Sequence, residues 1–131
     1  ERLGTSNTTS LAARVRAANA WPADYFISIH ANANTDPVVN GTEVYVYRKY
    51  TQSYYLAQHI LSAIVNVVGT RDNGVRVNPS LYVLRRTNMP AVLVELAYVT
   101  NAGDAEKLET MQPEFARGIY EGLLNYFGLD Q

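Results

Sequence analysis

Apolar residues recur along this chain at two spacings, one typical of helices and one typical of strands. Amphipathic helices are indicated over four segments, namely residues 11–18, 52–68, 105–109 and 113–126. Ser10 can cap the first of these, and Asn101 and Asp104 can cap the third. Gly69 stands where the second should end. The polar residues 4–9 are typical of a loop that precedes the first helix.

Strand-like runs alternate with these helices. Four runs have the composition of β-strands, namely residues 24–29, 42–47, 81–84 and 91–96. Within residues 42–47 the pattern alternates, with Val44 and Val46 on one side and Glu43, Tyr45 and Tyr47 on the other. This alternation predicts a half-exposed strand whose polar side faces the solvent.

Two of the runs, residues 25–29 and 91–96, are apolar at nearly every position, which is typical of strands buried on both faces. Between them, Asp72-Asn73-Gly74 has the chemistry of a turn. The order of elements therefore predicts an α/β fold, as a single domain over residues 1–131. Its three layers would be a mainly parallel sheet flanked by helices.

The composition narrows the classes of function. The 131 residues are 47% hydrophobic and 18% charged, which is typical of a folded domain. The lack of cysteine excludes disulfide scaffolds, thiolate metal sites and cysteine nucleophiles. A net charge of −1 argues against nucleic acid or an anionic membrane surface as partner. No apolar run is long enough to predict a membrane span.

Two residues carry candidate chemistry, because ligands of parallel sheets bind beyond the carboxyl ends of the strands. His30 follows the first predicted strand directly, where an imidazole can bind a metal ion or move a proton. Glu95 lies in an apolar run, where loss of hydration should raise the pKa of its carboxyl toward that of a general acid or base. If both strands are parallel and central, the two side chains share one edge of the sheet, as in a hydrolase with a metal-bound water.

Structural roles stay open for both residues. His30 can be a hydrogen-bonded histidine at a strand end, and Glu95 can form an ion pair with Arg85 or Arg86. One histidine also cannot hold a catalytic zinc ion, which usually needs three protein ligands. The other histidine, His59, lies within a predicted helix, where we expect a packed or surface residue rather than a ligand.

Two blocks of sequence resemble a known enzyme family. Residues 28–32 (Ser-Ile-His-Ala-Asn) and 90–96 (Pro-Ala-Val-Leu-Val-Glu-Leu) occur in this order, about 65 residues apart. Together with residues 11–19 and 41–45, they make the chain similar over nearly its whole length to the zinc-dependent N-acetylmuramoyl-L-alanine amidases of the type 3 family.

The resemblance implies an autolysin-like hydrolase that acts on peptidoglycan and muropeptides outside the cytoplasm, at the cell wall or in the periplasm. Its reaction would cleave the amide bond between N-acetylmuramic acid and L-alanine of the stem peptide with zinc-activated water. The family holds Zn²⁺ with two histidines and a glutamate. His30 matches the second histidine, and Glu95 matches the catalytic glutamate. The resemblance assigns no substrate-binding residue.

The chain also departs from the family pattern. The Gly-His-Gly-Gly stretch with the first histidine, and the helix with the glutamate ligand, have no match in this sequence, and Ala97-Tyr98 replaces a more usual Gly-Phe pair. We therefore expect an amidase catalytic domain that is incomplete at its N-terminus. Its further zinc ligands would lie in a segment absent from this chain, trimmed away or supplied as a separate N-terminal fragment. The alternatives are a non-catalytic peptidoglycan-binding module with an incomplete metal site and a generic α/β metallopeptidase.

Overall fold

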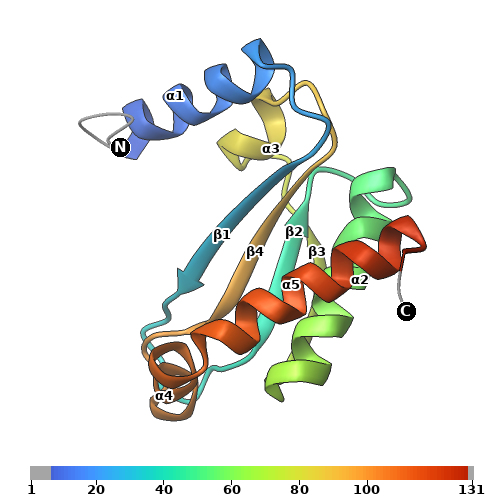
Figure 1. The fold of residues 1–131 in the computed structure, drawn as a ribbon. Helices are drawn as coiled ribbons and strands as arrows, with labels where there is room; N and C mark the ends of the chain where they lie inside the picture. Colours follow the sequence, from blue (N-terminus) through green and yellow to red (C-terminus); the bar gives the residue numbers. More distant parts are fainter. Residues whose placement is uncertain (1–6, 130–131) are drawn as a thin grey trace.

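Residues 7–129, which the computed structural model describes, form alternating helices and strands (Figure 1). In chain order these elements are α1 (Asn7–Ala20), β1 (Phe26–Asn32), β2 (Thr42–Val46), α2 (Gln52–Val68), β3 (Asp72–Val77), α3 (Tyr82–Arg86), β4 (Ala91–Tyr98), α4 (Ala102–Thr110) and α5 (Gln112–Phe127). None of the helices in this range is long and apolar enough to cross a membrane.

The four strands form one sheet in the order β1-β4-β2-β3. β1 runs parallel to β4, and β2 runs parallel to β3, whereas β2 and β4 are antiparallel. The sheet is therefore mixed but mainly parallel, and the predicted fold class is confirmed. The antiparallel contact lies at its centre, between the two parallel pairs.

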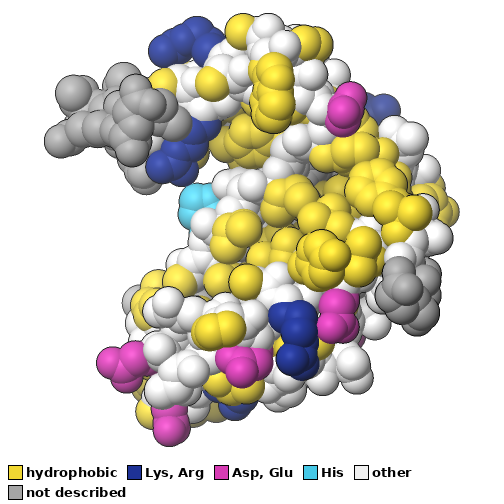
Figure 2. All heavy atoms as spheres, viewed as in Figure 1, with side chains coloured by type: hydrophobic (Ala, Val, Ile, Leu, Met, Phe, Trp, Pro, Cys, Tyr) yellow, Lys and Arg dark blue, Asp and Glu magenta, His cyan; other side chains and the backbone are white. Residues whose placement is uncertain are grey.

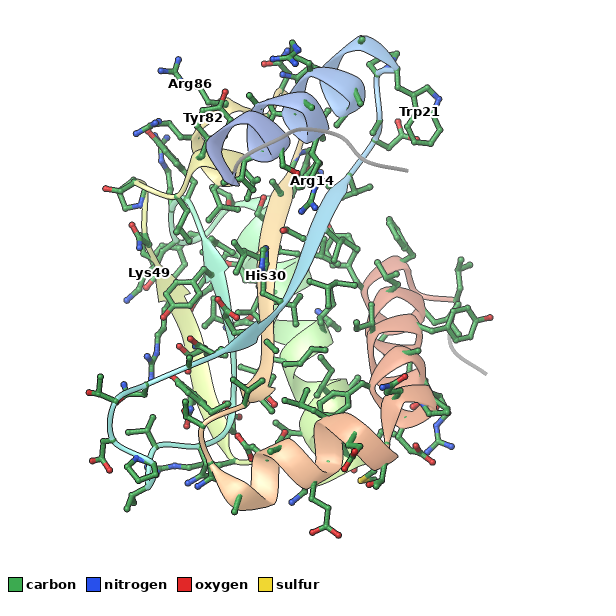
Figure 3. The ribbon with its side chains drawn as sticks, turned by 90° about the vertical axis from the view of Figure 1, so that its left-hand side faces the viewer. Arg14, Trp21, His30, Lys49, Tyr82 and Arg86 are labelled. Atoms are coloured by element: carbon green, nitrogen blue, oxygen red, sulfur yellow. The ribbon has the colours of Figure 1, made fainter. Side chains whose placement is uncertain are left out.

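The alternation of side chains along the strands gives the sheet two different faces. Val44 and Val94 belong to the larger core cluster, which the sheet forms with α2 and α5. Leu93 and Phe26 point the other way and pack with residues of α1 and α3. Helices thus flank both faces, as predicted, but α1 and α3 cover only the end of their face where β1 and β4 begin (Figures 1 and 3). The other half of that face carries no helix in the described part of the chain.

The longest helix follows the sequence prediction residue by residue. α2 begins after Thr51, whose hydroxyl accepts a hydrogen bond from the backbone N–H of Tyr54 at 3.3 Å. It ends at Gly69, which adopts a left-handed conformation with φ +85°. Its apolar stripe includes Leu56, Ile60 and Ile64, all of them fully buried.

The predicted strand over residues 81–84 is wrong, because this segment forms α3. Val83 and Leu84 are neighbours in sequence, and both are buried in the cluster with Val15. A strand would direct neighbouring side chains to opposite faces, whereas one helical turn can direct both toward the same core. The backbone N–H of Arg85 closes this turn on the carbonyl of Leu81 at 2.9 Å.

The predicted loop at the start of the chain is also partly wrong. α1 already begins at Asn7, so Ser10 lies within the helix and does not cap it. Residues 4–6 of the predicted loop lie outside the described residues. β1 is moreover not buried on both faces, because it is the edge strand of the described sheet and the side chain of Ile29 is 51% exposed.

α2 and α5 pack closely through glycine. A Cβ atom added to Gly122 would lie 2.6 Å from the Cα atom of Ile60 and 2.9 Å from the carbonyl oxygen of His59. Gly118 makes a similar approach to Ile64, one turn along the same pair of helices. The absence of a side chain at both positions lets the two backbones meet directly.

The replacement Gly122→Ala should therefore destabilise the fold by about 1–3 kcal/mol, because the backbone of α2 cannot move aside without cost. The measurement is urea unfolding followed by circular dichroism. Gly103→Ala is the matched control, since the nearest atom to its added Cβ, Asn101 Oδ1, is 3.5 Å away. The control should leave stability unchanged or raise it by up to about 1 kcal/mol. Equal stability of the two variants would contradict the packing argument.

Candidate active site

Three ionisable side chains form a row across the sheet. His30 on β1 is the register partner of Glu95 on β4, and Glu95 is in turn the partner of Glu43 on β2. Register partners point to the same face, and neighbouring strands lie about 4.8 Å apart. The structure thus brings together His30 and Glu95, the two residues that the sequence singles out, and adds a second carboxylate to them.

The row lies on the half of the face that α1 and α3 leave uncovered. Figure 2 shows a notch in the surface below α1, on the opposite side from the hydrophobic surface around α5. Figure 3 looks into this side, with His30 near the middle of the sheet and Arg14 extending toward it from α1. In the described part of the chain, His30 and Glu95 are partly exposed on this side, whereas Glu43 is buried.

His30 is oriented by its own strand. The hydroxyl of Ser28, two residues earlier on the same face, lies 2.7 Å from Nε2 of the imidazole. Nδ1 of the ring has no hydrogen-bond partner among the described residues. Burial lowers the pKa of His30, and the positive charge of Arg14 lowers it further. The ring is therefore neutral near pH 7, the form in which histidine binds a metal ion.

The Glu95 carboxyl has no hydrogen-bond partner recorded among the described residues. Its Oε1 atom is buried and accepts no hydrogen bond from any described residue. The ion pair with Arg85 or Arg86 that the sequence left open is not formed, and both arginines are exposed on α3. Burial, and then the charge of Glu43, raise the pKa of Glu95 from 4.5 to about 7. A carboxyl with this pKa can both accept and donate a proton at neutral pH.

Glu43 was expected to face the solvent, and this expectation is wrong. Its side chain is only 1% exposed, although it occupies the polar side of an alternating strand. Five side-chain donors surround its two carboxylate oxygens, namely Tyr45 (2.7 Å), Tyr98 (2.9 Å), Asn73 (3.2 Å), Arg76 (3.2 Å) and Asn32 (3.4 Å). The charge of Glu43 is thus compensated, whereas that of Glu95 is not.

A bulge in β3 supplies one of these donors. Thr42 and Val44 of β2 are two residues apart, but their partners Asp72 and Val75 are three apart. The extra residue is accommodated by a turn, in which Asp72 Oδ1 accepts a hydrogen bond from the N–H of Gly74 at 2.9 Å. Residues 72–74 therefore form the predicted turn with its expected hydrogen bond. The turn lies inside β3, however, and does not separate two elements. It directs Asn73 toward Glu43.

A second bulge, in β4, supplies another donor. His30 and Asn32 are two residues apart on β1, whereas their partners Glu95 and Tyr98 are three apart. This shift turns Tyr98 onto the face that carries Glu95, from which its hydroxyl reaches Glu43. Burial, and then the hydrogen bond to Glu43, raise the pKa of Tyr98 to about 12. The hydroxyl therefore keeps its proton and acts as a donor at neutral pH.

Asp104 of α4 holds the end of the row in place. This side chain is 3% exposed, and its Oδ2 atom accepts hydrogen bonds from the N–H groups of Gly41 (2.8 Å) and Tyr98 (2.9 Å). Gly41 precedes β2, and Tyr98 ends β4. One carboxylate thus joins the two strands that carry Glu43 and Glu95.

His59 takes no part in the row. It lies on the surface of α2, with Nδ1 2.8 Å from the carbonyl oxygen of Tyr55 and its ring against that of Tyr126. This position agrees with the surface role expected for it. Within residues 7–129, no three His, Cys, Asp or Glu side chains come close enough to hold a metal ion together. The described residues thus offer one neutral imidazole and one proton-transferring carboxyl, but not a complete zinc site.

The sequence matches one family over almost its whole length. Residues 2–125 match the family model described as N-acetylmuramoyl-L-alanine amidase. The chain is 41% identical to the N-acetylmuramoyl-L-alanine amidase LytC of Bacillus subtilis, over 95% of this chain and 26% of that protein. It thus spans about a quarter of the length of this relative.

Solved structures of amidases share the fold. An N-acetylmuramoyl-L-alanine amidase from Clostridium difficile is similar with a TM-score of 0.84 and 37% identity, over 93% of this chain and 67% of that one. The CwlD amidase from Clostridioides difficile, solved in complex with the GerS lipoprotein, is similar with a TM-score of 0.86 and 27% identity, over 96% of this chain and 67% of that one. About a third of each solved chain therefore has no counterpart here.

Removal of the Glu43 charge should change the titration of Glu95. In Glu43→Gln, the pKa of Glu95 should fall from about 7 toward 4.5, because a neighbouring negative charge no longer opposes its ionisation. It should remain above 4.5, since burial is the larger cause of the shift. The measurement is an NMR titration of the ¹³C-labelled glutamate carboxyls.

Glu106→Gln, on the exposed surface of α4, is the matched control and should leave the titration of Glu95 unchanged. Circular dichroism checks that both variants are folded. A Glu95 carboxyl that titrates identically in folded Glu43→Gln and in the unaltered chain would show that the two carboxylates do not interact.

Proposed function

Because the chain belongs to the N-acetylmuramoyl-L-alanine amidase family, we propose that it hydrolyses the amide bond between N-acetylmuramic acid and L-alanine in peptidoglycan. The observation that carries this proposal is the pairing of His30 with Glu95 on an open face of the sheet. A metal-binding imidazole beside a carboxyl with a pKa of about 7 suits the hydrolysis of an amide by activated water.

The proposed cofactor is Zn²⁺, with His30 as one ligand. Its neutral ring fits this role, as does its Nδ1 atom, which has no partner among residues 7–129, and Ser28 keeps the ring in one orientation. When bound, the ion supplies a Lewis acid that lowers the pKa of a water molecule and accepts the negative charge of the attacked carbonyl oxygen. The described residues do not complete its ligand set. We propose that the other ligands belong to a segment absent from this chain.

Glu95 moves the proton in the proposed reaction. Its unpartnered carboxylate accepts a proton from the attacking water, whose oxygen forms a bond with the carbonyl carbon of the lactyl group. Glu95 then gives the proton to the alanine nitrogen as the carbon–nitrogen bond breaks. The products are a lactyl carboxylate on the sugar and a stem peptide with a free amino group. Glu43, held by its five side-chain donors, lies beside Glu95 as its register partner.

This substrate places the proposed activity outside the cytoplasm, at the cell wall or in the periplasm. A peptidoglycan-binding module without catalysis is the second candidate, because the described residues lack a complete set of metal ligands. Such a module would retain the open face beside His30 and would bind muropeptides without cleaving them.

Two substitutions test the proposal. In the intact domain, which includes the segment proposed to supply the other zinc ligands, Glu95→Gln should reduce the release of stem peptides from muropeptides by roughly 10²–10⁴-fold but leave zinc binding intact, because only proton transfer is lost. His30→Ala should lower zinc affinity by at least about tenfold. Released peptides are measured by mass spectrometry, and zinc content is measured by elemental analysis after dialysis.

The matched controls are Glu109→Gln on α4 and His59→Ala on α2, both exposed and both remote from the row. Neither should change zinc content or turnover. Full turnover by Glu95→Gln would refute the role of this residue. An intact, zinc-loaded domain that binds muropeptides but never releases peptides would favour the binding module.

A further inference from the structure

A polar pocket opens beside the Glu43 end of the row. It has a volume of about 320 Å³ and lies between residues of the loop that joins β1 to β2, residues of β3, and Tyr98 at the end of β4. Three of its wall residues, Asn73, Arg76 and Tyr98, also donate hydrogen bonds to Glu43. The pocket therefore lies directly next to the row, separated from it by these hydrogen-bonded side chains.

The charge of this pocket is positive. Its charged wall residues are Arg71 and Arg76, and no carboxylate of the described residues lines it. Arg76 pairs with Glu43 through Nη1, whereas Arg71 forms no ion pair within the described part of the chain. Because the charge of Arg76 is already balanced, Arg71 supplies the net charge of the pocket. An anionic group is the ligand that complements it.

The position of the pocket limits how far this anionic group can lie from the reacting bond. β2 separates β4, which carries Glu95, from β3, which carries Arg76 and directly follows Arg71. Two strand spacings amount to about 10 Å. An extended peptide covers this distance in about three residues. The pocket can therefore receive a group up to about three residues from an amide bound at Glu95.

The chemistry of the proposed substrate indicates which of its arms enters the pocket, and this step rests on the proposed function. The sugars of a muropeptide are N-acetylated and neutral, and the lactyl carboxyl is consumed in the scissile amide. Its free carboxylates therefore all belong to the peptide arm. We propose that this pocket binds a free carboxylate of the stem peptide, with Arg71 as its main charged contact, and that the glycan arm leaves the row in the other direction.

Two carboxylates lie within the permitted distance, the free α-carboxylate of the second stem residue and the free carboxylate at the end of the side chain of a diamino diacid at the third position. Three disaccharide–tetrapeptide muropeptides distinguish them: one with both groups free, one amidated at the second residue, and one amidated at the third. Their dissociation constants are measured by titration calorimetry, independently of turnover, and their kcat/KM values are measured in parallel.

One of the two amidated muropeptides lacks the carboxylate that the pocket binds. The unaltered chain should bind this muropeptide roughly tenfold more weakly than the muropeptide with both carboxylates free, because a charge-assisted hydrogen bond is lost. Arg71→Gln should bind the free muropeptide as weakly as that amidated one. The substitution leaves the backbone intact, including the carbonyl of Arg71 that accepts a hydrogen bond from Thr42 N–H at 2.8 Å. Arg117→Gln on α5 is the matched control and should retain full discrimination.

The results separate this inference from the proposed function. Equal affinity of the unaltered chain for all three muropeptides, or no measurable binding of any, would overturn the carboxylate pocket even if hydrolysis continues. The carboxylate pocket would also be overturned if Arg71→Gln distinguishes the free from the amidated muropeptides as well as the unaltered chain does. Discrimination that depends on Arg71 but is not accompanied by hydrolysis in the intact, zinc-loaded domain would support the pocket and contradict the amidase reaction.

Discussion

A negative charge buried in a β-sheet is costly unless hydrogen-bond donors surround it, and Glu43 is such a charge at the centre of this sheet. Its donors come from β1, β2, β3 and β4 together. Two of them, Asn73 and Tyr98, reach it because β3 and β4 each contain a bulge nearby. The irregularities of the sheet are thus explained by a single carboxylate.

The two facing carboxylates of the sheet show how environment separates their chemistry. Glu43 and Glu95 are register partners on adjacent strands, so their charges oppose each other. Glu43 has five donors, and Glu95 Oε1 has none among the described residues. The mutual repulsion is therefore relieved on one side only, by protonation of Glu95. The residue that lacks structural partners is the one left free to react.

Elements with a strong periodic pattern could be predicted from the sequence. α2 has its apolar stripe and its Gly69, and these two signals indicated its extent. The neighbourhood of His30 and Glu95 followed from two apolar strands that run parallel. α3 was missed because its five residues are too few to show a period. The burial of Glu43 was missed because its donors are distant in sequence, and Asn73 reaches it only through a bulge that resembles an ordinary turn.

The hydrogen bonds of Asp104 have a consequence for the motion of this region. The amide groups of Gly41 and Tyr98 share one acceptor on α4. Neither strand end can separate from α4 without leaving a buried carboxylate underbonded, which is costly. The loop before β2, the last residue of β4 and the first turn of α4 therefore form one cooperative unit, which stays closed or opens as a whole. Slow amide exchange at one of these positions would thus be accompanied by slow exchange at the other.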